Sequence, residues 1–170
     1  MQANDWQELI AHRPEVRLVG FGVFQSHLVL LEREKGLERF ILRDFGSGQS
    51  AEIPMDEPIF TINFSSNPNF DTPRFRYVYS SMTTPTQTWE YEFESGERHL
   101  LKQTPVPSYD PSLYKTERIW ASADDGKLVP VSLVYKDGVV LNGQNPALLY
   151  GYGSYAVSYT HLTLPTICSV

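Results

Sequence analysis

The feature that most constrains this chain is an internal repeat of β-strand patterns. Short runs rich in aromatic and β-branched residues follow Pro14 about every ten residues, separated by Gly, Pro, Ser and Asn. A shift of 48 positions aligns two copies of one unit, with Leu28–Glu34 on Arg76–Met82, Phe40–Phe45 on Thr88–Phe93, and Ser47-Gly48 on Ser95-Gly96. The repeated unit is therefore a strand hairpin, a Ser-Gly turn and a further strand.

One more strand precedes the hairpin in each copy, VRLVGFGVF in the first and PIFTINF in the second. Four antiparallel strands in a unit of about 50 residues are typical of a β-propeller blade, whereas a β-sandwich has no reason to repeat itself. We therefore predict about two four-stranded blades of a β-propeller. The alternative is that two aromatic hairpins resemble each other by chance.

A single helical pattern precedes the repeat. Asp5 and Glu8 can form a capping box, and Pro14 would stop a helix that begins there. We expect a short helix over residues 5–12 and a mainly β chain after it.

The texture of the sequence changes near Tyr109, where VPSYDPSLYKTE reads as a linker. Beyond it, RIWASADDGKLVPVSLVYKDG predicts two strands joined by a turn at Asp125-Gly126. The run PALLYGYGSY is apolar throughout and stops at glycines, which suits a strand covered on both faces. We expect residues 109–155 to begin an α/β domain.

Composition excludes several classes of function. The net charge is −6 and the Lys and Arg residues are scattered, which argues against nucleic-acid binding. The lone cysteine, Cys168, cannot form an internal disulfide, and neither a signal peptide nor a membrane-spanning apolar run is present. We expect a cytoplasmic protein that binds neither nucleic acid nor membranes; the sequence does not determine its oligomeric state.

No catalytic or metal-binding motif stands out. The Gly-x-Ser-x-Gly elbow of α/β hydrolases is absent. The motif requires glycine two places before the serine, but Phe45 stands two places before Ser47 and Tyr152 two places before Ser154. Four histidines lack metal-ligand spacing and are expected on the surface or in loops: His12, His27, His99 and His161. The sequence therefore predicts no metal and no cofactor.

Asp124 and Asp125 are an acidic pair only in sequence. Adjacent residues of a hairpin point to opposite faces, and Asp-Asp-Gly-Lys is favourable turn chemistry. We interpret both residues as part of a turn, with no general acid or base role.

Several segments resemble the prolyl oligopeptidase family of serine peptidases, and within it the oligopeptidase B group. They include HLVLLERE, DEPIFTINFSSNPNFDT, RYVYSSMTTPTQTWEYEF, LLKQTPVPSYDPSLY, ERIWASADDGKLVPVSLVYK and PALLYGYGSY, and together the matching segments cover about residues 6–155. DEP-x-F-T, SSMTTP and LLYGYGSY are the most specific of these motifs.

The resemblance implies a seven-bladed propeller over an α/β-hydrolase domain that cuts short peptides after Lys and Arg. Residues 1–108 would be the last blades, and 109–155 the linker and first hydrolase strands. The family's Ser-Asp-His triad and its acidic substrate-binding residues lie downstream of the YGYG segment. The resemblance therefore implies that this chain alone is inactive and retains one site residue, Tyr152, whose hydroxyl would serve the oxyanion hole.

From about residue 156 the sequence departs from the family pattern. The family continues with Gly where this chain has Ala156, and no charged residue occurs from Gly138 to Val170. We interpret residues 156–170 as a tail that does not belong to the family and is not biological sequence. A competing hypothesis from another class is a non-catalytic β-rich module that binds a peptide or protein through aromatic strands.

Overall fold

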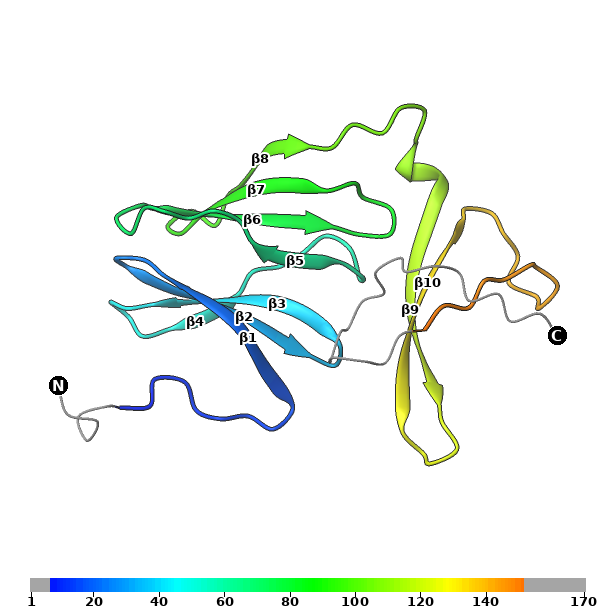
Figure 1. The fold of residues 1–170 in the computed structure, drawn as a ribbon, viewed down its shortest axis with the longest axis horizontal. Helices are drawn as coiled ribbons and strands as arrows, with labels where there is room; N and C mark the ends of the chain where they lie inside the picture. The colour runs from blue at the N-terminus through cyan, green and yellow to red at the C-terminus, as the bar shows by residue number, and fades with distance from the viewer. Residues whose placement is uncertain (1–6, 152–170) are drawn as a thin grey trace.

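The computed structural model describes residues 7–151, which form two four-stranded antiparallel sheets and a separate two-stranded hairpin (Figure 1). The first sheet has the order β1 (Val16–Val23), β2 (His27–Glu34), β3 (Leu37–Asp44) and β4 (Ser50–Glu52). The second has the order β5 (Thr61–Phe64), β6 (Arg74–Ser80), β7 (Gln87–Glu92) and β8 (Arg98–Gln103). The repeat predicted from the sequence is confirmed, because each copy forms one four-stranded sheet with neighbouring strands in chain order.

Turn chemistry explains why each sheet folds back on itself. β2 and β3 pair from Glu34 with Leu37, so only Lys35 and Gly36 form the connection, and both have positive φ, 50° and 77°. Such a two-residue turn matches the twist of the strands that it joins and favours glycine at its second position.

The Ser-Gly turns of the two sheets are the same structure. Gly48 donates its N–H to the carbonyl of Asp44 at 2.9 Å, and Gly96 donates to the carbonyl of Glu92 at 3.0 Å. Both glycines have a φ close to +70°, a conformation that side-chain-bearing residues rarely adopt. The two copies of the repeat therefore share the Ser-Gly dipeptide because both turns need a glycine with positive φ at the same place.

The hydrophobic core lies between the two sheets. Alternate residues of the inner strands point into it, including Val29 and Leu31 on β2 and Phe75 and Tyr77 on β6. Phe40 on β3 links the layers, with its ring centroid 5.3 Å from Phe75 and 5.6 Å from Tyr77. The two sheets thus share one aromatic core.

The predicted N-terminal helix is wrong for the residues that the structure describes. Residues 7–13 are irregular and run beside the first sheet, where Arg43 donates to the carbonyl of Leu9 at 3.4 Å and Arg13 pairs with Glu32. Two helical turns are too few to be stable alone, so contacts with the sheet decide the conformation. Asp5, the expected N-cap, lies outside the described residues.

The predicted hairpin of the second half is confirmed. β9 (Tyr114–Ser122) and β10 (Leu128–Lys136) pair along their whole length, after a short 3-10 helix, η2 (Pro111–Leu113). Asp124 and Asp125 lie in the turn, where Asp125 accepts the N–H of Lys127 at 3.1 Å, as expected of turn residues. Arg118 on β9 donates to the carbonyl of Lys35, which ties the hairpin to the β2–β3 turn.

The predicted strand in PALLYGYGSY is not formed in the part that the structure describes. Residues 146–151 have no regular structure, and Leu148 and Leu149 are each 89% exposed. A strand covered on both faces needs neighbouring strands and helices, and within residues 7–151 β9 and β10 pair only with each other. The α/β part of the fold therefore stays a prediction.

Within residues 7–151, no helix has the length and apolarity needed to cross a membrane.

Candidate functional site

Tyr152, the one predicted site residue, lies outside the described residues. Its role in an oxyanion hole therefore stays a prediction from the resemblance. Ser154, His161, Cys168 and the whole segment 156–170 also lie outside the described part of the chain.

The structure does bring a serine, a histidine and an aspartate together near the start of β2. The Oγ of Ser26 lies 2.7 Å from Nδ1 of His27, and Oδ2 of Asp44 lies 3.4 Å from Nε2 of His27. His27 is only 6% exposed, and its ring stacks on Phe93, which directly follows β7 of the second sheet, with ring centroids 4.5 Å apart. The prediction that His27 lies on the surface is wrong, because β2 buries its side chain between the two sheets.

This group is structural. In a catalytic triad the serine faces Nε2 of the histidine and the carboxylate faces Nδ1, which is the reverse of the contacts of His27. The carboxylate of Asp44 already accepts the N–H of Ser47 within the turn that follows β3. Hydrogen bonds from Ser47 lower the pKa of this carboxyl group. Ser26 and Asp44 therefore hold His27 in place where the two sheets meet.

A denser polar cluster surrounds Glu57, between β4 and β5. Its carboxylate accepts hydrogen bonds from four hydroxyl groups: Tyr79 at 3.0 Å, Ser81 at 2.7 Å, Thr83 at 2.7 Å and Thr84 at 2.5 Å. The acceptor belongs to the DEP motif and three of the donors belong to the SSMTTP motif. Two segments that are distinctive in sequence are therefore parts of one site, which we call the Glu57 cluster.

The Glu57 cluster borders the connection to the hairpin. The hydroxyl of Tyr109 donates to the carbonyl of Thr83 at 2.8 Å, and its ring stacks on Tyr114 at the start of β9. A shallow, open depression of about 250 Å³ lies here, and its lining consists of Ser81, Met82, Thr83, Thr84, Pro85, Val106 and Tyr109. Glu57 thus fixes the β6–β7 loop, and that loop holds the linker.

Glu57 should make stability depend on pH. Burial alone raises the pKa of Glu57, but the hydrogen bonds from Ser81, Thr84, Thr83 and Tyr79 outweigh it and lower the pKa below its ordinary value of 4.5. A carboxylate with a lowered pKa stabilises the fold above the unfolded-state pKa and loses that effect as the pH falls through the folded-state pKa. Glu57→Gln is expected to cost about 1–2 kcal/mol of the free energy of unfolding at pH 7.

The difference between Glu57→Gln and the unaltered chain should shrink as the pH falls from above 4.5 through the lower folded-state pKa. Thermal melts followed by circular dichroism at several pH values measure this difference. Glu94→Gln, an exposed change in the β7–β8 turn, is the matched control and should cost little at any pH. A constant difference across this range would contradict the role assigned to Glu57.

The remaining histidines differ in their surroundings. His12 is exposed in the N-terminal segment, as expected. His99 on β8 is partly buried, and its Nε2 lies 3.8 Å from Oε2 of Glu97. Glu92, Glu97 and His99 could together hold a metal ion, since their ligand atoms lie within 4.8 Å of one another. No spacing rule in the sequence signals this group, because Glu92 approaches the other two only across the β7–β8 turn.

Comparison with known protein families supports the assignment of the two sheets to a β-propeller. The family described as "Prolyl oligopeptidase, N-terminal beta-propeller domain" matches residues 1–104. The chain belongs to the prolyl oligopeptidase family. Its two four-stranded sheets are therefore blades of the β-propeller domain of that family, and its relatives are peptidases.

Two curated relatives in this family are bacterial. The chain is 46% identical to "Dipeptidyl aminopeptidase BI" of Pseudoxanthomonas mexicana, over 91% of this chain and 21% of that protein. It is 36% identical to "Protease 2" of Moraxella lacunata, over 78% of this chain and 19% of that protein. The chain thus spans about a fifth of the length of these relatives.

Two solved structures of oligopeptidase B share the arrangement of strands. The enzyme from Trypanosoma brucei, in a closed form with covalently bound antipain, is 38% identical with a TM-score of 0.77, over 86% of this chain and 22% of that one. The enzyme from Leishmania major is 29% identical with a TM-score of 0.71, over 83% of this chain and 21% of that one.

Proposed function

We propose that this chain is part of a serine endopeptidase of the oligopeptidase B type, which hydrolyses short peptides after Lys or Arg. The observation that carries the proposal is the similarity to oligopeptidase B of Trypanosoma brucei, 38% identical over 86% of this chain. The substrates are then short basic peptides that enter beneath the propeller.

In this proposal residues 1–108 are propeller blades, residues 109–155 are the linker and the start of the hydrolase domain, and residues 156–170 are foreign to the family. Two features of the described part support the first boundary. β8 ends at Gln103, and Tyr109 then connects the second sheet to the hairpin through Thr83 and Tyr114.

The roles of the residues follow from the chemistry of acyl transfer. Tyr152 would donate its hydroxyl to the oxyanion of the tetrahedral intermediate, a contribution of about 10²–10³ in rate when a nucleophile creates that anion. Ser26 and His27 do not replace the family triad, because their contacts are reversed and the imidazole is packed between two sheets. We therefore propose that the chain by itself is inactive.

A second candidate is a dipeptidyl aminopeptidase, favoured by 46% identity to the protein of that name from Pseudoxanthomonas mexicana. The two candidates differ in whether the substrate needs a free amino terminus: a dipeptidyl aminopeptidase does, and an endopeptidase does not. A non-catalytic peptide-binding module is a third candidate, which the exposed apolar residues of β1 and β8 favour, among them Leu18, Phe21 and Leu100.

Two fluorogenic substrates separate these functions when tested on the longer protein that contains this sequence. An amino-blocked peptide with Arg before the scissile bond should be cleaved by an oligopeptidase B type enzyme. An unblocked dipeptide conjugate should be cleaved instead by a dipeptidyl aminopeptidase. Cleavage of neither would favour the binding module.

The 170-residue chain alone should cleave neither substrate. Turnover by this chain that a serine-directed inhibitor abolishes would overturn the proposal that it lacks the catalytic groups.

A further inference from the structure

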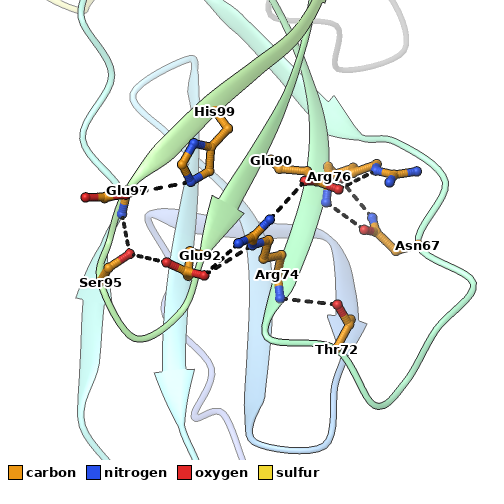
Figure 2. A network of polar contacts seen from close by, with 9 residues as sticks. All are labelled: Asn67, Thr72, Arg74, Arg76, Glu90, Glu92, Ser95, Glu97 and His99. Carbon is orange, nitrogen blue, oxygen red and sulfur yellow. Dashed lines mark hydrogen bonds and ion pairs between the residues drawn. The ribbon is translucent and has the colours of Figure 1, made fainter.

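Three side chains with metal-binding atoms converge at the β7–β8 turn (Figure 2). Glu92 is the last residue of β7, Glu97 precedes β8, and His99 is its second residue. One ligand atom from each lies within 4.8 Å of the other two. We call these residues the Glu-Glu-His cluster.

The imidazole of the cluster has an unused nitrogen. Nε2 of His99 is shielded from solvent and makes no hydrogen bond, although the ring as a whole is partly exposed. The nearest carboxylate oxygen, on Glu97, is 3.8 Å away, which is beyond hydrogen-bond distance. A buried polar atom without a partner is uncommon, and one cause is an ion that the site is built to hold.

The first sheet provides an internal comparison for the cluster. The equivalent positions there, 48 residues earlier, are Asp44, Gln49 and Ala51. The turn is nevertheless the same in both sheets, with the glycine bonds of Gly48 and Gly96 at 2.9 and 3.0 Å. Because the blade folds without a histidine or a second carboxylate here, the fold does not require the cluster.

We propose that the Glu-Glu-His cluster binds a divalent transition-metal ion of the zinc type. Imidazole and carboxylate are both Zn²⁺ ligands, with bonds of about 2.0–2.2 Å, and tetrahedral coordination places ligand atoms about 3.4 Å apart. The observed atoms lie within 4.8 Å of one another, so the side chains must move by about an ångström to bind, and Glu97 is the most exposed of the three. Water would complete the coordination.

Neighbouring groups orient the ligands. Ser95 donates from Oγ to Oε2 of Glu92 at 2.7 Å and accepts the N–H of Glu97 at 3.2 Å, so one hydroxyl spans both carboxylate residues. Arg74 donates to Oε1 of Glu92 at 3.0 Å and 3.2 Å and leaves Oε2 directed at the turn. Such outer contacts hold metal-binding carboxylates in place.

Electrostatics permits a cation despite the presence of Arg74. The network around the cluster contains Glu90, Glu92 and Glu97 against two guanidinium groups, Arg74 and Arg76 (Figure 2). The carboxylates therefore outnumber the fixed positive charges at the site.

Titration of the full 170-residue chain with ZnCl₂ by calorimetry tests the site. We expect one equivalent of Zn²⁺ to bind, and we expect His99→Gln and Glu97→Gln each to weaken binding by about tenfold or more. Two matched controls remove the same groups elsewhere: His12→Gln in the exposed N-terminal segment and Glu94→Gln in the same turn. Both should leave the affinity unchanged.

A second measurement needs no variant. Zn²⁺ should shift the imidazole nitrogen resonances of His99 in the unaltered chain, measured by NMR, while those of His12 stay in place. Absence of binding, binding that His99→Gln leaves unchanged, or His99 resonances that Zn²⁺ does not shift would each overturn the proposal.

Discussion

Phe75→Ala is expected to lower the free energy of unfolding by about 3–5 kcal/mol, because truncation of a buried phenylalanine removes apolar contacts and leaves a cavity. Phe75 is 0% exposed, and its ring centroid lies 5.3 Å from Phe40 and 6.0 Å from Phe93. It therefore holds the first sheet against the second. Urea unfolding followed by the fluorescence of Trp89, which packs against the same core, measures the loss.

Phe21→Ala is the control for this change, because it makes the same truncation on β1 at a side chain that is 64% exposed. Its cost should be under about 1 kcal/mol, since little apolar surface is removed from contact. Equal costs for the two variants would contradict a core shared between the sheets. Since small domains are stable by only about 5–15 kcal/mol, the loss of Phe75 would remove a large share of the total.

Arg39→Leu is expected to cost about 3 kcal/mol, because it leaves a buried charge without one of its partners. Glu32 on β2 is only 1% exposed, and its carboxylate pairs with Arg13 and, at 3.3 Å, with Arg39. Arg39 also pairs with Glu34 at 2.5 Å, so it serves two carboxylates of the same strand. Urea unfolding compares this variant with the unaltered chain.

The double variant Glu32→Leu/Arg39→Leu should recover much of that loss, since it removes the buried charge together with its partner. Arg76→Leu is the matched control: Arg76 is exposed and pairs with Glu90 at 2.8 Å, and such surface pairs contribute about 0–1 kcal/mol. A double variant less stable than Arg39→Leu alone would show that Glu32 itself stabilises the sheet.

The strands and turns of the two sheets could be predicted because their signals are local. Alternation of aromatic and β-branched residues marks a strand at any place in the chain, and glycine marks a turn that needs positive φ. The equivalence of Ser47-Gly48 and Ser95-Gly96 was readable for this reason, and both dipeptides form the same turn. The hairpin turn at Asp125-Gly126 was equally plain.

The errors fell where a local pattern competes with packing. Asp5 and Glu8 give residues 5–12 a capping signal, but in the described residues from 7 onward two turns of helix cannot outweigh the contacts of Arg13 and Leu9 with the first sheet. PALLYGYGSY reads as a central strand, but a central strand requires partners on both sides. The sequence predicts His27 on the surface or in a loop, but β2 buries the side chain and its ring stacks on Phe93.

The polar sites could not be read from the sequence. Glu57 lies more than 20 residues from each of its hydroxyl donors. Neither the DEP motif nor the SSMTTP motif contains a pattern that predicts contact with the other. The Glu-Glu-His cluster joins the end of β7 to the start of β8, where the turn sets the approach of Glu92 to His99.

By itself the sequence determined the repeat, the strands and the turn glycines, because backbone conformation and period-2 burial depend on neighbouring residues. It also determined membership of the prolyl oligopeptidase family, because the family motifs are runs of consecutive residues. Only the tertiary structure decided which sheet faces carry Phe40 and Phe75 into one core, and which side chains meet at Glu57, His27 and His99. The burial of His27 depends on how the two sheets cover their shared aromatic surface, whereas Glu57 and His99 depend on how the loops of the second sheet fold back. Burial is a property of the whole arrangement, since apolar area leaves water only when both faces are in place.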